Sequence, residues 1–173
     1  MSMTRLADAL GVKRPTLLYH FPTRADIIVE ALRDLLTEQA GLVMPRIDEH
    51  DHPIDRLFAR VRAVHDFHEG SEERIVFLSQ AIAAVGRERM VAILEVGEAV
   101  FAAHRKDQAE RIRAGIRDGL VQPCDVEALM ALIRSFTEGM LVQRVMTDVD
   151  FEPVHEFLWS HVLAPLKKQD IAA

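Results

Sequence analysis

The spacing of the apolar residues is the feature that most restricts the fold of this chain. The clearest example is a set of six apolar residues that recur at helical spacing: Ile27, Ile28, Ala31, Leu32, Leu35 and Leu36. Such a pattern gives an α-helix one apolar face. No segment shows sustained alternation of apolar and polar residues, and Gly and Pro fall mostly where one helical pattern ends and the next begins. The sequence therefore predicts an all-α protein.

Helical patterns of this kind cover most of the chain. We expect eight helices, at about residues 3–10, 14–20, 24–43, 54–69, 72–85, 88–118, 125–147 and 152–166. Thr23, followed three residues later by Asp26, predicts a capping box at the start of the third helix. Pro15 falls in the first turn of the second helix, where the missing N–H costs nothing.

A polar stretch from Pro45 to Pro53 is the best candidate for a linker. We therefore divide the chain into a head with its connecting helix, residues 1–44, and a body, residues 45–173. The HDH triplet within the polar stretch has residue types that bind metals, but a flexible linker explains it better. We expect neither a metal nor a cofactor.

Composition narrows the class of protein. The 173 residues fit one domain, or a small module fused to a larger one. The apolar runs are far shorter than the roughly 20 residues that span a bilayer. Cys124 is the single cysteine, so an intrachain disulfide is excluded and a reducing cytoplasm is the expected compartment. Nucleophile elbows, phosphate loops and paired-metal motifs are absent from the sequence, so we do not expect an enzyme.

Charge is unevenly distributed. Residues 1–24 contain four basic side chains and one acidic side chain, whereas the whole chain has a formal net charge of −6. A basic head on an acidic body suggests contact with a polyanion, although chance clustering on a solvated surface would look the same.

The first two predicted helices meet at Gly11 in a turn of about four residues, which is the geometry of a helix-turn-helix. The second helix would present its first residues to base edges in a major groove. We expect Arg14 and Thr16 to contact bases, and Lys13 and Arg24 to contact phosphates.

The segment LADALGVKRPTLLYHFPTRADIIVEAL resembles the DNA-binding signature of the TetR family of transcriptional regulators. The matching residues are Thr16, Leu17, Tyr19, His20, Phe21 and Arg24, and the resemblance covers about residues 2–36. It implies a head followed by a helical ligand-binding and dimerisation body, and a repressor that binds a pseudo-palindromic operator as a homodimer until a small-molecule effector releases it. The DNA-binding residues carried over or inferred are Lys13, Arg14, Pro15, Thr16, Tyr19, His20 and Arg24.

Two departures from the family pattern affect this head. Family members carry a further helix before the motif, whereas this sequence begins at Met1, almost at the family's second helix. We expect either an upstream start or a less stable head. Leu18 stands where a tyrosine often contacts phosphate, and Lys13 stands where a serine or threonine often caps the recognition helix.

The last two predicted helices each carry two apolar stripes, which favours a four-helix bundle across a two-fold axis. The candidate interface residues are Leu132, Ser135, Gly139, Val142, Met146, Trp159, Val162 and Leu166. The alternative is that both stripes of each helix are buried within one subunit.

Aromatic and amphipathic residues on the predicted inner helices could line a cavity for a small, largely apolar effector. The candidates are Phe67, His68, Phe77, Phe101, His104 and Phe136. Each could instead be an ordinary core or surface residue. The alternative function is a dimeric helical ligand-binding or interaction protein whose head does not bind DNA.

Overall fold

Helices make up the computed structural model, which describes residues 2–84, 86–147 and 149–168, without the side chains of residues 81–90, 92–94, 96 and 98. They are α1 (Met3–Ala9), α2 (Arg14–His20), α3 (Arg24–Asp48), α4 (Pro53–His68), α5 (Glu72–Ala84), α6 (Gly86–Arg117), α7 (Val126–Thr147) and α8 (Glu152–Leu158). A π-helical turn (Trp159–Leu163) and a 3₁₀ turn (Ala164–Leu166) continue α8. The all-α prediction is confirmed, and each predicted helix is present within a few residues of its expected bounds.

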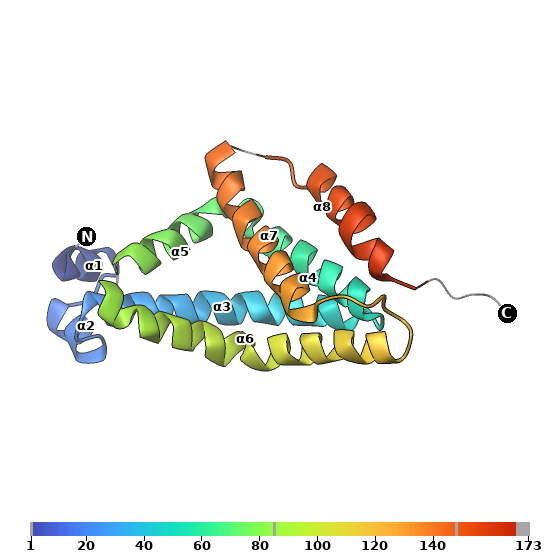
Figure 1. Ribbon diagram of the computed structural model, residues 1–173. Helices are drawn as coiled ribbons and strands as arrows, with labels where there is room; N and C mark the ends of the chain where they lie inside the picture. The colour runs from blue at the N-terminus through green and yellow to red at the C-terminus, as the bar shows by residue number, and fades with distance from the viewer. Residues whose placement is uncertain (1, 85, 148, 169–173) are drawn as a thin grey trace.

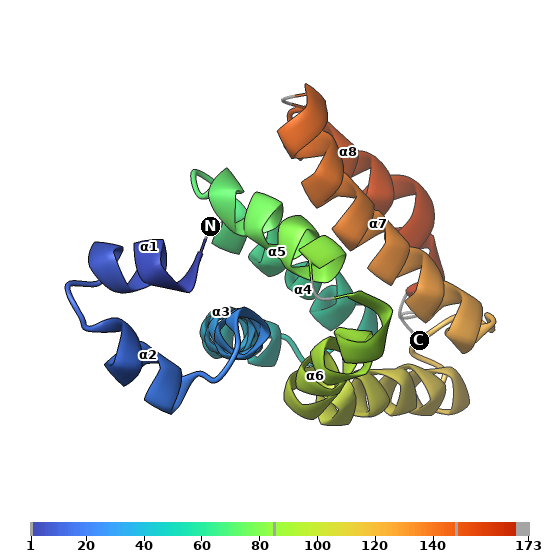
Figure 2. The ribbon, with the colours of Figure 1, turned by 90° about the vertical axis from the view of Figure 1, so that its left-hand side faces the viewer.

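Two long helices, α3 and α6, lie side by side and set the length of the molecule (Figure 1). The short helices α1 and α2 lie at one end, beside the start of α3 (Figure 2). The chain enters α2 through Gly11, whose φ of +66° is readily adopted only by glycine. α3 begins with the predicted capping box. The Thr23 hydroxyl accepts from the Asp26 N–H at 3.3 Å, and the Asp26 carboxylate accepts from the Thr23 N–H at 2.8 Å.

The prediction of a linker from Pro45 to Pro53 is wrong, because α3 continues through Pro45 to Asp48. Val43 and Ile47, on either side of the proline, are fully buried in a cluster with Ala63 and Val64 of α4. Burial of these side chains offsets the backbone hydrogen bond that Pro45 cannot donate.

The short connection between α3 and α4 is also structural. His52 caps α4 by accepting from the Ile54 N–H through Nδ1 at 3.2 Å, and its Nε2 lies 3.2 Å from the Leu120 carbonyl oxygen. Asp48 forms an ion pair of 2.7 Å with the buried guanidinium of Arg56. Within the described ranges, no group of three or more His, Cys, Asp or Glu side chains is arranged to hold a metal ion.

The main core lies where α4, α6 and α7 meet the C-terminal helix. Ile54, Leu57, Ile112, Ile133 and Leu163 are completely or almost completely buried there. No helix in the described part of the chain is long and apolar enough to cross a membrane.

Candidate nucleic-acid interface and body pockets

The outer face of α2 is open to solvent. All seven predicted DNA-binding residues are exposed: Lys13, Arg14, Pro15, Thr16, Tyr19, His20 and Arg24. Leu17 of α2 and Ala7 of α1 are buried. One face of α2 is therefore packed inside the head, and the opposite face is accessible to a partner.

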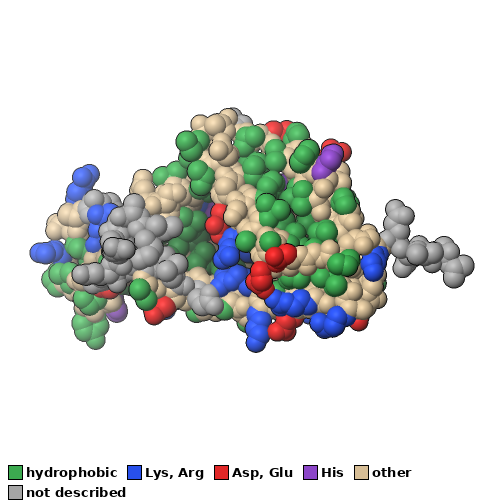
Figure 3. Space-filling model, in the orientation of Figure 1, with side chains coloured by type: hydrophobic (Ala, Val, Ile, Leu, Met, Phe, Trp, Pro, Cys, Tyr) green, Lys and Arg blue, Asp and Glu red, His purple; other side chains and the backbone are tan. Residues whose placement is uncertain are grey.

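The charge on this face is positive. α2 has no acidic residue in its first turn, and Figure 3 shows Lys and Arg side chains at the end of the molecule formed by α1 and α2. Lys13 occupies the N-cap of α2 without a capping hydrogen bond, as expected from the lysine at that position. Tyr19 is 84% exposed and lies edge-on against the His20 ring, with ring centroids 5.1 Å apart. A side chain this exposed contributes little to the core and is accessible to a partner.

The head is joined to the body by α3 without an interruption in the helix. Near its N-terminal end, Leu32 is buried beside Leu78 of α5. Near its C-terminal end, Val43 and Ile47 are buried against α4. The helix that follows α2 is therefore packed directly against both α4 and α5.

An apolar stripe of α7 is exposed in the isolated subunit. Its predicted interface members Leu132, Ser135, Gly139, Val142 and Met146 all face solvent, and Met146 is 72% exposed. The other stripe, with Leu129, Ile133 and Leu141, is buried in the subunit. Figure 3 shows hydrophobic side chains gathered over α7 and α8 on one face.

The C-terminal helix presents a different face from the one expected. Trp159, Val162 and Leu166 pack against the core of their own subunit. Phe157 is 60% exposed instead, with its ring stacked on His161 at 4.4 Å. Trp159 follows the regular turns of α8 and packs on Phe58 of α4, with ring centroids 5.0 Å apart. The π-helical turn over Trp159–Leu163 then rotates the residues after it, such as Leu166, away from a 3.6-residue pattern. Phe157 and His161 thus form an exposed pair on the C-terminal helix.

Two pockets on the described part of the body have linings that contain none of the six predicted ligand residues. Phe67 lies under the guanidinium of Arg74, 4.4 Å from the ring centroid, and Phe136 packs against the core. His68 is buried, which lowers its pKa to about 4, and its Nδ1 has no partner in the described structure. His104 is partly buried and its pKa is also lowered, first by burial and then by Arg60. Phe77 and Phe101 are half-buried.

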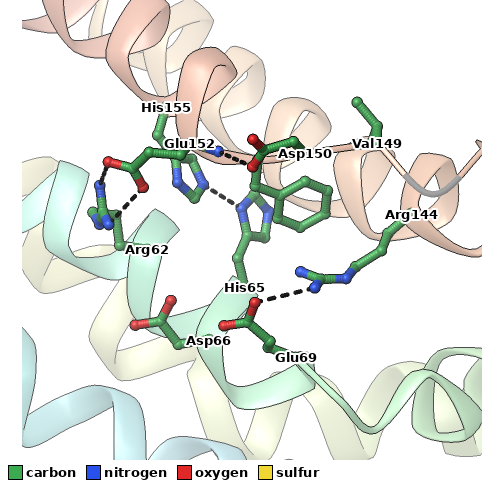
Figure 4. Close-up of a pocket in the computed structure, with 10 residues that line it drawn as sticks. Arg62, His65, Asp66, Glu69, Arg144, Val149, Asp150, Glu152 and His155 are labelled. Atoms are coloured by element: carbon green, nitrogen blue, oxygen red, sulfur yellow. Dashed lines mark hydrogen bonds and ion pairs between the residues drawn. The ribbon is translucent and has the colours of Figure 1, made fainter.

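The first pocket, of about 170 Å³, has a pair of histidines at its base (Figure 4). Nδ1 of His65 lies 2.6 Å from Nε2 of His155, and Nε2 of His65 lies 2.9 Å from the Thr137 carbonyl oxygen. Burial lowers the pKa of His65 to about 4, and burial, followed by Arg62, lowers the pKa of His155. Both rings are therefore neutral near pH 7.

Both guanidinium groups around this histidine pair are paired with carboxylates. Arg62 holds Glu152 through two hydrogen bonds of 3.0 and 2.9 Å. Arg144 pairs with Glu69 and Glu72, each at 3.1 Å. The sequence analysis did not find this pair. The signal available was that His65 shares the buried face of α4 with Leu57 and Val61, so its ring needed an internal partner.

The second pocket, of about 300 Å³, lies between α4, α6 and α7. Its lining is Arg60, Arg105, Lys106, Ala109, Arg113, Glu127, Met130 and Arg134. Figure 3 shows Lys and Arg side chains, with Asp and Glu side chains among them, over α6 and the N-terminal part of α7. Five of these eight side chains are cationic and one is acidic, so this pocket differs in kind from the first.

No protein-family model matches the chain. No curated protein matches it. Two solved structures resemble it over nearly its whole length. The ketosteroid transcriptional regulator KstR2 of Mycobacterium tuberculosis aligns with a TM-score of 0.67 at 21% identity, over 98% of this chain and 86% of that chain. PfmR, a TetR family transcriptional regulator from Thermus thermophilus, aligns with a TM-score of 0.71 at 20% identity, over 97% of this chain and 90% of that chain. The chain therefore has the fold of TetR-family transcriptional regulators.

Proposed function

We propose that this protein is a TetR-like transcriptional regulator that binds double-stranded DNA through α2 and the start of α3. The observation that carries the proposal is the exposure of all seven head residues on a short helix with a buried opposite face. Their chemistry suits the task, because Arg14 and Thr16 can contact base edges while Lys13 and Arg24 neutralise phosphates. Tyr19 and His20 extend the same surface.

The exposed stripe of α7 supports a homodimer. Leu132, Val142 and Met146 would be costly to leave in water as a continuous stripe, and Gly139 within it lets a second helix approach closely. A two-fold dimer presents two copies of α2 to successive major-groove faces, so the operator is expected to be pseudo-palindromic.

A repressor released by an effector also fits the path of α3. This helix is packed against the body at Val43 and Ile47 and leads without interruption to the head. An effector that favours one position of α3 changes the distance between the two heads of the dimer. Because the operator fits only one such distance, this change weakens DNA binding. Effector and operator then oppose each other through a coupling of typically ~1–3 kcal/mol.

Selection from a pool of random duplexes tests the proposal, because it assumes no operator sequence. The full chain should enrich sequences with two related half-sites, and the protein bound to them should be dimeric. The double variant Arg14→Ala/Thr16→Ala should lose the enrichment. Failure of the intact dimer to enrich any duplex would favour the alternative, a dimeric helical ligand-binding or interaction protein whose head does not bind DNA.

A further inference from the structure

The basic pocket between α4, α6 and α7 has a charge balance that the fold does not explain. Arg60 comes from α4, Arg105, Lys106 and Arg113 come from α6, and Arg134 comes from α7. Glu127 is the acidic residue of the lining, and it is hydrogen-bonded to Arg113. The chain as a whole has a net charge of −6, so a cluster of five cations around one cavity is unexpected from its overall composition.

Three of these cations differ from those of the histidine pocket, which are paired with carboxylates. Across the described residues, neither Arg60, Lys106 nor Arg134 forms an ion pair, whereas Arg62 and Arg144 are both paired with carboxylates. Burial and the charge of Arg105 lower the pKa of Arg60, Glu138 opposes them, and Arg134 lowers that pKa further. Arg60 is thus a desolvated cation held among like charges, and a bound anion would relieve that repulsion.

The rest of the lining is apolar. Ala109 is buried in the core, and Met130 packs against the same core cluster. The volume of about 300 Å³ is enough for a small organic molecule, though not for a large one. A lining that combines cations with apolar groups suits a ligand with one oxyanion and one small apolar group.

We propose that this pocket binds a small organic anion, a carboxylate or phosphate ester whose apolar part contacts Ala109 and Met130 while Arg60 and Arg134 bind its oxyanion. This replaces the largely apolar effector expected from the sequence. That the anion acts as the effector rests on the proposed function, whereas its binding does not.

Isothermal titration of the full chain with three probes tests the binding. Phenyl phosphate and benzoate carry the two oxyanions on the same ring, and benzyl alcohol is a neutral analogue. We expect at least one of the anions to bind, more weakly as salt is raised, and benzyl alcohol to bind far more weakly. A preference for phenyl phosphate or for benzoate identifies the oxyanion, and either preference supports the proposal.

Arginine variants locate the site. Arg60→Gln and Arg134→Gln should each weaken anion binding by about tenfold or more, the usual scale for loss of a charge-assisted hydrogen bond. Arg117→Gln removes an exposed arginine of α6 that lies outside the lining, so it should leave binding unchanged. Melting temperatures without ligand provide the folding control. Arg60→Gln should be at least as stable as the parent chain, because it removes a crowded cation.

Several results would overturn the proposal. Benzyl alcohol binding as tightly as the anions would do so, as would equal losses in Arg60→Gln, Arg134→Gln and Arg117→Gln. If neither anion binds but Arg134→Gln weakens self-association in sedimentation, the cations receive acidic groups of a second copy and the proposal is wrong. Anion binding without any DNA binding would leave this proposal standing and contradict the proposed function alone.

Discussion

His65 and His155 are joined by one hydrogen bond whose direction is set by their surroundings. The Thr137 carbonyl oxygen can only accept, so the proton of the neutral His65 ring lies on Nε2. Nδ1 of His65 is then an acceptor, and Nε2 of His155 must donate to it across 2.6 Å. This leaves Nδ1 of His155 as an unprotonated acceptor, which has no partner in the described structure. The pair ties α4 to α7 and α8 inside the body.

Removing the hydrogen-bond donor at His155 should therefore destabilise the fold more than replacing it with a donor of a different shape. His155→Leu leaves the buried Nδ1 of His65 without a donor and should lower the free energy of unfolding by about 1–3 kcal/mol. His155→Gln keeps an N–H donor and should lower it less. Urea denaturation of both variants checks the difference, and equal losses would show that the hydrogen bond adds nothing beyond packing.

Stability should fall when the solution is acidified. The pKa of His65 and that of His68 are each lowered from 6.5 to about 4 in the folded state, so the unfolded chain binds more protons between those values. The stability that these two neutral histidines contribute is complete above pH 6.5. It is lost as the pH falls toward about 4, at up to about 1.4 kcal/mol per pH unit for each histidine. Urea denaturation across this range measures the slope. His68→Leu should reduce it, whereas His161→Leu, at an exposed position, should not; a slope unchanged by His68→Leu would contradict the assignment.

The turn after α6 depends on the absence of a side chain at Gly115. A Cβ there would lie 2.8 Å from a methyl carbon of the buried Val121 and 3.2 Å from Pro53. Gly115→Ala should lower the free energy of unfolding by about 1–3 kcal/mol through overpacking. Gly41→Ala, in an open position on α3, should instead raise it by about 0.5–1 kcal/mol. Thermal or urea unfolding distinguishes them, and similar effects in both variants would disprove the close contact.

Self-association should depend on the exposed stripe of α7. Gly139 has open space around it in the isolated subunit, so Gly139→Leu should disturb a partner helix rather than its own fold. We expect a weaker dimer in sedimentation equilibrium with an unchanged melting curve at low protein concentration. Gly41→Leu, equally open on α3, is the control and should leave association intact. A parent chain that sediments as a monomer at all concentrations would refute the homodimer.

The helices and the head were predictable because their signals are local. Helical spacing, Pro15 in the first turn of α2 and the Thr23–Asp26 capping box each involve residues within one or two turns. The exposure of α2 followed from the same patterns, because Ala7 and Leu17 fall on the inner sides of two short helices.

The errors arose where distant contacts decide the structure. Pro45 looked like the start of a linker, but burial of Val43 and Ile47 against α4 keeps the helix intact. Trp159 looked like an interface residue, but it packs on Phe58 of α4 and on the core of its own subunit. The partners His65 and His155 are 90 residues apart in the sequence. The cations of the basic pocket come from three helices that are far apart in the sequence, so the sequence alone did not group them.

Binding of the dimer to a selected operator, followed by fluorescence anisotropy over a range of salt concentrations, tests the central claim most directly. Lys13→Ala and Arg24→Ala should each weaken binding to all duplexes alike and reduce the slope of log Kd against log salt by about one unit. Arg14→Ala and Thr16→Ala should instead change which base pairs are preferred, at about 1–3 kcal/mol per lost contact. Arg117→Gln, at the far end of α6, should change neither quantity. If the head variants bind DNA as the parent chain does, with the same salt slope and the same preference, α2 is not the DNA-binding surface and the account is wrong.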